Sequence, residues 1–235
     1  MTLDEVMSAL ASKGSEQTQK TWLRHGAKEP IFGVKIADMK VIAKKIRGDQ
    51  NLALALYDTG NGDAMYLAGI VADGRKMTRA QLDRWAKEAK WPMICGGTVA
   101  VVAHEHPEGF DVAMKWIDSP EEHVAVAGWT TLGGIVATVP DEKLPIKKLD
   151  ALLDRVARAL KTAANRVRYA MNSFVISCGT YVAALGDKAI ATARKAGRVE
   201  CDMGDTACEV PDAESYIIKC RRGAPVAKKR KTIRC

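Results

Sequence analysis

Basic side chains gather in three short segments whose spacing would let them hold phosphate groups. In the first segment (40–47) the cations follow the i, i+4, i+7 spacing of one helical face. In the second (166–172) an arginine and an asparagine lie four residues apart, and in the third (228–231) the cations are consecutive. Each cation placed on a phosphate adds salt-dependent affinity for a polyanion. A solvated helix face is the alternative for the first segment, and an aid to solubility is the alternative for the third. The candidates are Lys40, Lys44 and Arg47; Arg166, Arg168 and Asn172; and Lys228, Lys229, Arg230 and Lys231.

A tryptophan at the start of a helix is the strongest candidate for aromatic chemistry. Trp91 precedes Pro92, a residue typical of the first helical turn, and it falls outside any regular apolar stripe. An electron-rich indole face stabilises a nearby cation. Trp91 therefore either serves a positively charged ligand or only packs against the start of the helix. Trp129 is a second candidate of this kind, whereas Trp85 falls on an apolar stripe and is predicted to be structural.

The cysteines do not form a recognisable metal-binding pattern. Cys201, Cys208, Cys220 and Cys235 are separated by 7, 12 and 15 residues, whereas zinc ribbons and fingers need close cysteine pairs. We therefore expect free thiols of a reducing compartment and no metal. The sequence has no glycine-rich phosphate loop, HExxH motif or nucleophile elbow. This disfavours a nucleotide-dependent enzyme or a metalloprotease, and we expect no cofactor.

Composition indicates an ordinary globular chain with an unevenly placed charge. Of the 235 residues, 47% are hydrophobic and 27% charged, which excludes disorder and low complexity. The net charge of +8 comes from the segment 219–235, which holds eight basic residues and no acid, so that 28 basic and 28 acidic residues remain elsewhere. No apolar run approaches the roughly 20 residues of a membrane span. Asp4 and Glu5 replace the positive charge of a signal peptide, so we expect a cytoplasmic protein.

Apolar residues recur at helical spacing along almost the whole chain. Leu149, Leu152, Leu153, Val156 and Leu160 make one such stripe, and no comparable run of strict alternation occurs. The pattern predicts an all-α protein of roughly a dozen helices, each short enough that it must bury a face on its neighbours.

Capping signals mark where several of these helices begin. Thr78–Gln81 is typical of a capping box, and in Ser119–Glu122 a serine cap precedes a proline and two acids. Pairs of short helices stacked every 35–45 residues or so favour a superhelical α-solenoid of HEAT-like repeats, with a compact bundle as the alternative.

The helical pattern stops after Gly197. We therefore expect a helical-repeat domain over 1–197 and a separate segment over 198–235. In the latter, 199–220 is predicted to be irregular or partly extended. Residues 200–214 hold six acids and no base, and the basic tail follows.

Several motifs lie in a distinctive order in the first half of the chain. They are FGVKI (32–36), MKVIAKKI (39–46), LALALY (52–57), AMYLAGIVAD (64–73) and AKW (89–91). Together they resemble the DNA alkylation-repair family of HEAT-like proteins, the AlkD-like glycosylases. The likeness covers about residues 5–195.

The resemblance implies a concave groove that grips duplex DNA through its backbone. In the family, the N-glycosidic bond of cationic N3- or N7-alkylated purines is hydrolysed, and a carboxylate and aromatic faces stabilise the oxocarbenium-like sugar. The family does this without turning the base into a pocket, so the usual expectation of base flipping does not transfer.

The family's catalytic residues carry over poorly. The tryptophan that opens the catalytic helix corresponds to Trp91, but the carboxylate expected four residues later falls on Cys95. The basic residue that the family has early in the helix after Ser119 is replaced here by Val126, and the family's second cleft tryptophan is replaced by Ser173. A thiol replaces a fixed negative charge only when its pKa is strongly depressed. Trp129, one turn after Val126, is the remaining aromatic candidate for the cleft.

These observations lead to one interpretation and one alternative. We expect a monomeric protein that binds duplex DNA and resembles DNA alkylation-repair enzymes, with Trp91 and Trp129 as candidate catalytic residues. Hydrolysis of the N-glycosidic bond of alkylated purines is the activity that the resemblance implies. The alternative is a non-catalytic HEAT-like scaffold that binds a protein partner or a DNA structure, which the cysteine at position 95 favours.

Overall fold

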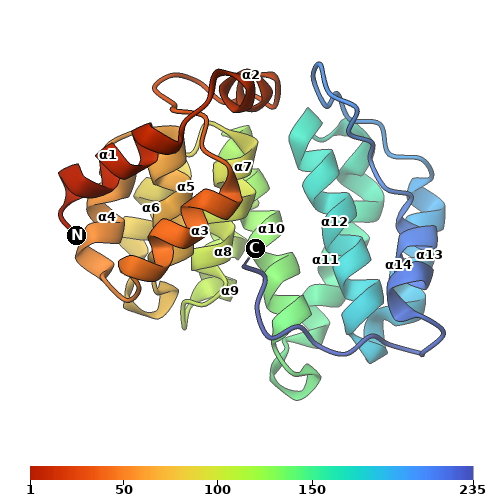
Figure 1. The fold of residues 1–235 in the computed structure, drawn as a ribbon. Coiled ribbons are helices and arrows are strands. Elements are labelled where there is room, and N and C mark those ends of the chain that lie inside the picture. The colour runs from red at the N-terminus through yellow and green to blue at the C-terminus, as the bar shows by residue number, and fades with distance from the viewer. Residues whose placement is uncertain (235) are drawn as a thin grey trace. The chain divides into compact units, whose positions relative to one another are not determined.

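The computed structural model describes residues 1–234, and within them every regular element is a helix (Figure 1). The prediction of an all-α chain is confirmed. A single isolated β-bridge joins Gly14 to Val34. Short 3-10 turns connect some of the helices, at Gly74–Lys76, Asp141–Lys143, Leu160–Thr162 and Ala183–Leu185.

The chain divides into two compact units. The first comprises Met1–Glu108 together with 203–207 and Arg234, and the second comprises Gly109–Asp202 and Cys208–Ile233. The segment beyond 197, expected to stand apart from the helical domain, is shared between the two units. We describe each unit by itself.

The first unit is built from short helices around α5. Its helices are α1 (Leu3–Lys13), α2 (Glu16–Arg24), α3 (Ile36–Lys45), α4 (Gln50–Asp58), α5 (Gly62–Val71), α6 (Arg79–Glu88), α7 (Pro92–Ile94) and α8 (Ala100–Ala103). Residues 62–69 of α5 are all buried, because α1, α3, α4 and α7 pack around that helix. An α-helix that is apolar on every side is stable only in such a surrounded position.

A buried carboxylate fastens the loop before α3 to this core. Asp63, in the first turn of α5, accepts the backbone N–H groups of Phe32, Gly33 and Val34 over 2.6 to 2.9 Å. Burial raises the pKa of Asp63, and the three hydrogen bonds oppose that rise. The bonds hold the loop in place, and the loop leads directly into the basic face of α3.

In the second unit, two long helices form the core. Its helices are α9 (Gly109–Trp116), α10 (Glu122–Thr138), α11 (Ile146–Ala159), α12 (Asn165–Tyr181), α13 (Gly186–Ala196) and α14 (Ala213–Arg221). α10 and α12 pack along each other, and α12 also contacts α13 and α14. Glycines allow the close approaches: a methyl group added at Gly128 would meet Ile117, and one at Gly179 would meet Ile217 of α14.

Two of the sequence-based element predictions need correction, and one is confirmed. The capping box at Thr78 is present, with Gln81 bonding back to the Thr78 N–H over 2.8 Å. Ser119, however, is not a helix cap: α10 begins at Glu122, and the Ser119 hydroxyl accepts the Glu121 N–H within the preceding turn. The irregular segment predicted over 199–220 is wrong for residues 213–220, which belong to α14 (Ala213–Arg221).

Candidate nucleic-acid interface

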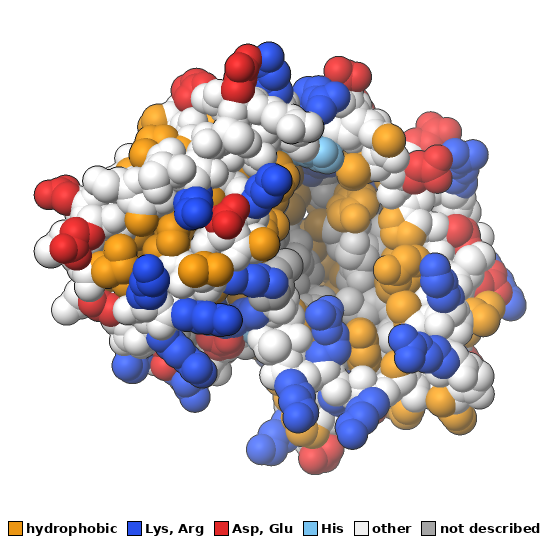
Figure 2. Space-filling view, viewed as in Figure 1, with side chains coloured by type: hydrophobic (Ala, Val, Ile, Leu, Met, Phe, Trp, Pro, Cys, Tyr) orange, Lys and Arg blue, Asp and Glu red, His pale blue; other side chains and the backbone are white. Residues whose placement is uncertain are grey.

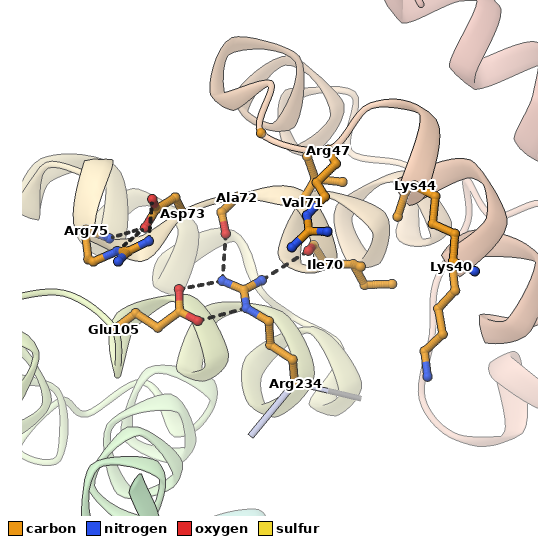
Figure 3. A pocket seen from close by; sticks show the side chains of 12 residues that line it. Lys40, Lys44, Arg47, Ile70, Val71, Ala72, Asp73, Arg75, Glu105 and Arg234 are labelled. Carbon is orange, nitrogen blue, oxygen red and sulfur yellow. Dashed lines mark hydrogen bonds and ion pairs between the residues drawn. The ribbon is translucent and has the colours of Figure 1, made fainter. Parts of the chain in front are cut away.

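A cavity of about 490 Å³ in the first unit gathers five cations against two carboxylates (Figure 3). α3 and the turn after it supply one wall, and the end of α5 with the residues that follow supplies another. Figure 2 shows Lys and Arg side chains clustered on this face of the first unit. The charged residues of its lining are Lys40, Lys44, Arg47, Arg75 and Arg234, with Asp73 and Glu105.

The predicted basic strip forms one side of this cavity. Met39, Ile42 and Ala43 turn the apolar face of α3 into the core, so Lys40 and Lys44 are exposed on the opposite face. Arg47, just beyond the end of α3, joins them in the lining. Within residues 1–234 none of these three cations has a hydrogen bond or ion pair to a protein group. We call Lys40, Lys44 and Arg47 the α3 cation triad.

Both carboxylates of the cavity are already neutralised. Arg75 Nε lies 2.9 Å from Asp73 Oδ1, and this hydrogen bond lowers the pKa of Asp73. Arg234 Nε lies 2.8 Å from Glu105 Oε1, and Nη2 lies 2.5 Å from Oε2. Burial would raise the pKa of Glu105, but the Arg234 guanidinium holds it below its usual range. The positive charge of the α3 cation triad is therefore uncompensated.

Arg234 was missed as a site residue, because in the sequence it is one of eight similar cations in the tail. In the structure its guanidinium also donates to the carbonyl oxygens of Gly69, Ile70 and Ala72 at the end of α5. A cation there satisfies carbonyl groups that the helix leaves unbonded and suits the negative end of its dipole. The contact spans more than 160 positions of sequence, which no local pattern reveals.

Much of the predicted basic tail is ordered against the second unit. The Lys229 ammonium lies 2.8 Å from Asp141 Oδ1 and 2.8 Å from the Val136 carbonyl oxygen. The backbone N–H of Arg230 donates to the Ala137 carbonyl over 2.8 Å. Lys229 is thus occupied by protein groups, while the side chains of Lys228, Arg230 and Lys231 are exposed.

Trp91 holds the start of α7 in place. Its side chain is 5% exposed, its Nε1–H donates to the His25 carbonyl over 3.1 Å, and its ring lies 5.9 Å from that of Trp22. Trp91 caps α7 with Pro92 as the first helical residue, as the sequence predicts. In this arrangement the indole ring packs against protein groups on most of its surface.

Cys95 is buried and begins a π-helical segment, Cys95–Val99, between α7 and α8. Its thiol donates to the carbonyl oxygens of Ala89 over 2.8 Å and Trp91 over 3.3 Å. Both groups that face the sulfur are acceptors, and acceptors favour the protonated thiol over a thiolate. The position four residues after Trp91 therefore holds no negative charge.

Trp129 lies in the core of the second unit rather than on a surface. Its ring is fully buried, 5.3 Å from the ring of Phe174, with the Arg155 guanidinium 5.6 Å from its centre. As placed, the indole offers no face to a ligand. Trp85 is likewise fully buried, stacked on Tyr57 at 3.9 Å, as its apolar stripe predicts.

The polar cluster at the start of α12 holds the acidic segment. Asn165 bonds through its side chain to the N–H and the carbonyl of Asp202, over 2.7 and 2.8 Å. Arg168 Nη2 donates to the Asn165 side chain over 3.2 Å. Asn172 is 2% exposed and donates to the Pro211 carbonyl over 2.9 Å.

Arg166 is half-buried, and its backbone N–H donates to Glu122. The structure does not bring Arg166, Arg168 and Asn172 together as one open basic face. Their predicted contact with nucleic acid stays a prediction.

The described cysteines, Cys95, Cys178, Cys201, Cys208 and Cys220, are free thiols, and Cys235 lies outside the described residues. Among residues 1–234 no three His, Cys, Asp or Glu side chains are grouped as a metal site would need. None of the helices in this part of the chain is long and apolar enough to span a membrane.

Comparison with known proteins yields a family and several relatives. Residues 6–201 match the family described as DNA alkylation repair enzyme. Uncharacterized proteins of Listeria innocua and Listeria monocytogenes are 32% and 31% identical to the chain over 227 residues, covering 94% of it and 98% of each relative.

One solved structure is similar over the full length of both chains, at 36% identity and a TM-score of 0.91. It is described as belonging to a new family related to the HEAT-like repeat DNA glycosylases, with affinity for branched DNA structures. This similarity confirms the HEAT-like helical fold that the sequence predicts.

Proposed function

The chain belongs to the family of DNA alkylation repair enzymes, and from that premise we propose that it binds DNA through the α3 cation triad of its first unit. The observation that carries the proposal is the uncompensated charge of Lys40, Lys44 and Arg47 in a cavity whose two carboxylates are already paired. The affinity of the structural relative for branched DNA supports the same class of ligand.

The chemistry of the cavity favours the phosphate backbone as the contacted group. Lysine ammonium groups and an arginine guanidinium at a concave surface suit phosphate oxygens, and such contacts fix a protein on DNA without reading its sequence. We therefore propose binding that tolerates any sequence, that includes duplex DNA, and that tightens where two duplex arms present phosphates from more than one strand.

We further propose that this binding proceeds without base excision. A protonated thiol at Cys95 supplies no carboxylate for an oxocarbenium-like sugar, and Trp91 and Trp129 are engaged with protein groups. In a single-turnover assay on duplexes that carry N7-methylguanine or N3-methyladenine, we expect base release no faster than the spontaneous rate. Enzyme-dependent release would overturn this part of the proposal.

The binding proposal is tested by charge-matched variants. In the test variant Lys40, Lys44 and Arg47 become Gln; in the control, Lys13, Arg24 and Lys28 become Gln, which are exposed cations of the same unit outside the cavity. Fluorescence anisotropy on a duplex and a four-way junction gives affinity against salt. The slope of log K against log salt should fall by about 0.9 for each phosphate that the protein no longer neutralises, in the test variant only.

The same measurement decides between DNA and the protein-scaffold alternative. Equal loss of affinity in the test and control variants would mean that net charge, and not the cavity, attracts DNA. No measurable DNA binding by the unaltered chain would overturn the proposal and favour the scaffold.

A further inference from the structure

A second cationic cavity, of about 500 Å³, lies in the second unit where α12 and α14 end. Its lining joins two tyrosines, Tyr181 and Tyr216, to four cations, and no acid is found among the described residues that line it. The cations are Lys219, Arg221, Arg222 and Lys228. We propose that this cavity binds an unpaired stretch of nucleic acid, with a base stacked on tyrosine and its phosphates on the cations. The inference goes beyond the proposed function, whose contacts all belong to the first unit.

Hydrogen bonds to the last turn of α12 hold the walls of the cavity in place. The Arg221 guanidinium donates to the Gly179 carbonyl through Nε at 2.8 Å and Nη2 at 2.6 Å. The Ala227 N–H donates to the Thr180 carbonyl over 2.8 Å. Ile217, fully buried against Gly179, fixes α14 on α12. The cavity is therefore shaped before any ligand arrives.

Three of its four cations differ from Arg221 in having no protein partner among the described residues. The side chains of Lys219, Arg222 and Lys228 are exposed, and none has a hydrogen bond or ion pair within residues 1–234. Arg221 already bonds to the Gly179 carbonyl oxygen in the last turn of α12, whereas the other three cations make no bond to that helix end. A concentration of unpaired cations in a formed hollow suits a ligand with several phosphates.

The tyrosines make single-stranded nucleic acid the ligand that fits best. Tyr216 lies next to the buried Ile217 in α14 and is 44% exposed, so its ring is accessible to a ligand. Aromatic faces beside a basic track are the means by which proteins hold unpaired bases, since every base offers a face for stacking. A duplex keeps its bases stacked inside, and an acidic peptide would use the cations alone.

Stacking is tested with a matched pair of substitutions at Tyr216. The probe is a fluorescent oligothymidylate, which has no secondary structure. Tyr216→Ala should weaken its binding by about tenfold, whereas Tyr216→Phe, which keeps the aromatic face, should bind as the unaltered chain does. Equal affinities of the two variants would overturn the proposal. Circular dichroism of both variants checks that α14 remains folded.

The phosphate contacts are tested by replacing Lys219, Arg222 and Lys228 with Gln. The salt slope should fall by about 0.7 for each phosphate that these cations no longer neutralise. The control replaces Lys147, Lys161 and Arg198, exposed cations of the same unit outside the cavity, and should leave the slope nearly unchanged. If polyglutamate competes with oligothymidylate and Tyr216→Ala binds both as before, the cavity is a site for acidic peptides and the proposal fails.

A free thiol in the lining reports directly on occupancy. Cys220 is half-exposed in the cavity, and Cys208 is exposed outside it. Oligothymidylate should slow alkylation of Cys220 by iodoacetamide, followed by peptide mass spectrometry, and should leave Cys208 unchanged. Unchanged alkylation of Cys220 at saturating oligothymidylate would overturn the proposal.

The two proposed sites fail independently in these experiments. The variant that lacks the α3 cation triad should still bind oligothymidylate, and the bound oligothymidylate should still slow alkylation of Cys220. Tyr216→Ala should still bind the intact duplex. Loss of duplex binding with retained protection of Cys220 would contradict the proposed function alone, and the reverse pattern would contradict this inference alone.

Discussion

Single residues decide what chemistry the first unit can perform. At Cys95 a thiol donates to the carbonyl oxygens of Ala89 and Trp91, so the surroundings of this side chain are rich in acceptors. A carboxylate introduced there would face lone pairs instead of donors, and a buried charge without a partner is strongly disfavoured. Position 95 thus aligns with the catalytic carboxylate of the DNA glycosylases, but the groups around it do not stabilise a negative charge.

This environment predicts that a carboxylate introduced at position 95 does not produce glycosylase activity. Cys95→Asp should lower the free energy of unfolding in urea by about 3 kcal/mol, because it buries an unpaired charge or forces a proton onto it. Cys95→Ser, which keeps a donor of similar size, should change that free energy by about 1 kcal/mol or less. A Cys95→Asp variant that is as stable as Cys95→Ser and that excises N7-methylguanine would show that this account of the site is wrong.

At the scale of helices, local patterns in the sequence carried most of the information. Stripes of apolar residues recur at helical spacing because each helix buries one face, and the capping box at Thr78 is formed as predicted. α14 escaped detection because it buries only Ala213 and Ile217, too few residues to make a stripe. The π-helical turn from Cys95 depends on how the chain packs around it: a methyl group added at Gly97 would meet the Tyr66 ring, and no local signal encodes that contact.

The basic sites show the same limit. The i, i+4, i+7 spacing correctly places Lys40, Lys44 and Arg47 on one surface. Nothing in the sequence distinguishes Arg234, which is half-buried and bonded to the end of α5, from Lys228, which is exposed, since both lie in the same basic tail. The second cavity depends on α14, so it could not be predicted before that helix was known.

The packing of α14 on α12 predicts a coupled pair of substitutions. A methyl group at position 179 would collide with the Ile217 side chain, so Gly179→Ala should cost about 1–3 kcal/mol of stability. Ile217→Val, which removes one methylene, should cost about 0.5–1.5 kcal/mol. The double variant should be more stable than the sum of the two losses implies, because the smaller valine makes room for the methyl group. Strict additivity in urea unfolding would contradict this packing.

At the scale of the whole molecule, the C-terminal segment contributes to both units. Residues 208–233 belong to the second unit and Arg234 to the first, so the last part of the chain is not a free basic arm. This changes the meaning of the net charge of +8. Lys229 and Arg234 bond to protein groups, whereas Lys219, Arg222 and Lys228 line the second cavity, where a polyanion can reach several cations at once.

The ion pair of Arg234 with Glu105 predicts a pH-dependent part of the stability. The pKa of Glu105 in the folded chain lies below its usual value of 4.5, so the folded state favours the ionised carboxylate. The stabilisation that results is fully present above pH 4.5. It disappears as the pH falls through the lowered pKa. Arg234→Gln should therefore lower the free energy of unfolding by about 1–3 kcal/mol at pH 7, and the difference from the unaltered chain should shrink as the pH falls below 4.5. Hydrogen exchange of the Gly74 amide, which donates to Glu105, should accelerate in the same variant.

The control is Lys231→Gln, which alters an exposed cation three positions away. It should change neither the pH-dependent stability nor the exchange of the Gly74 amide. A stability difference for Arg234→Gln that stays constant from pH 7 down to pH 3 would show that the arginine acts only through the carbonyl groups of α5, and not through Glu105.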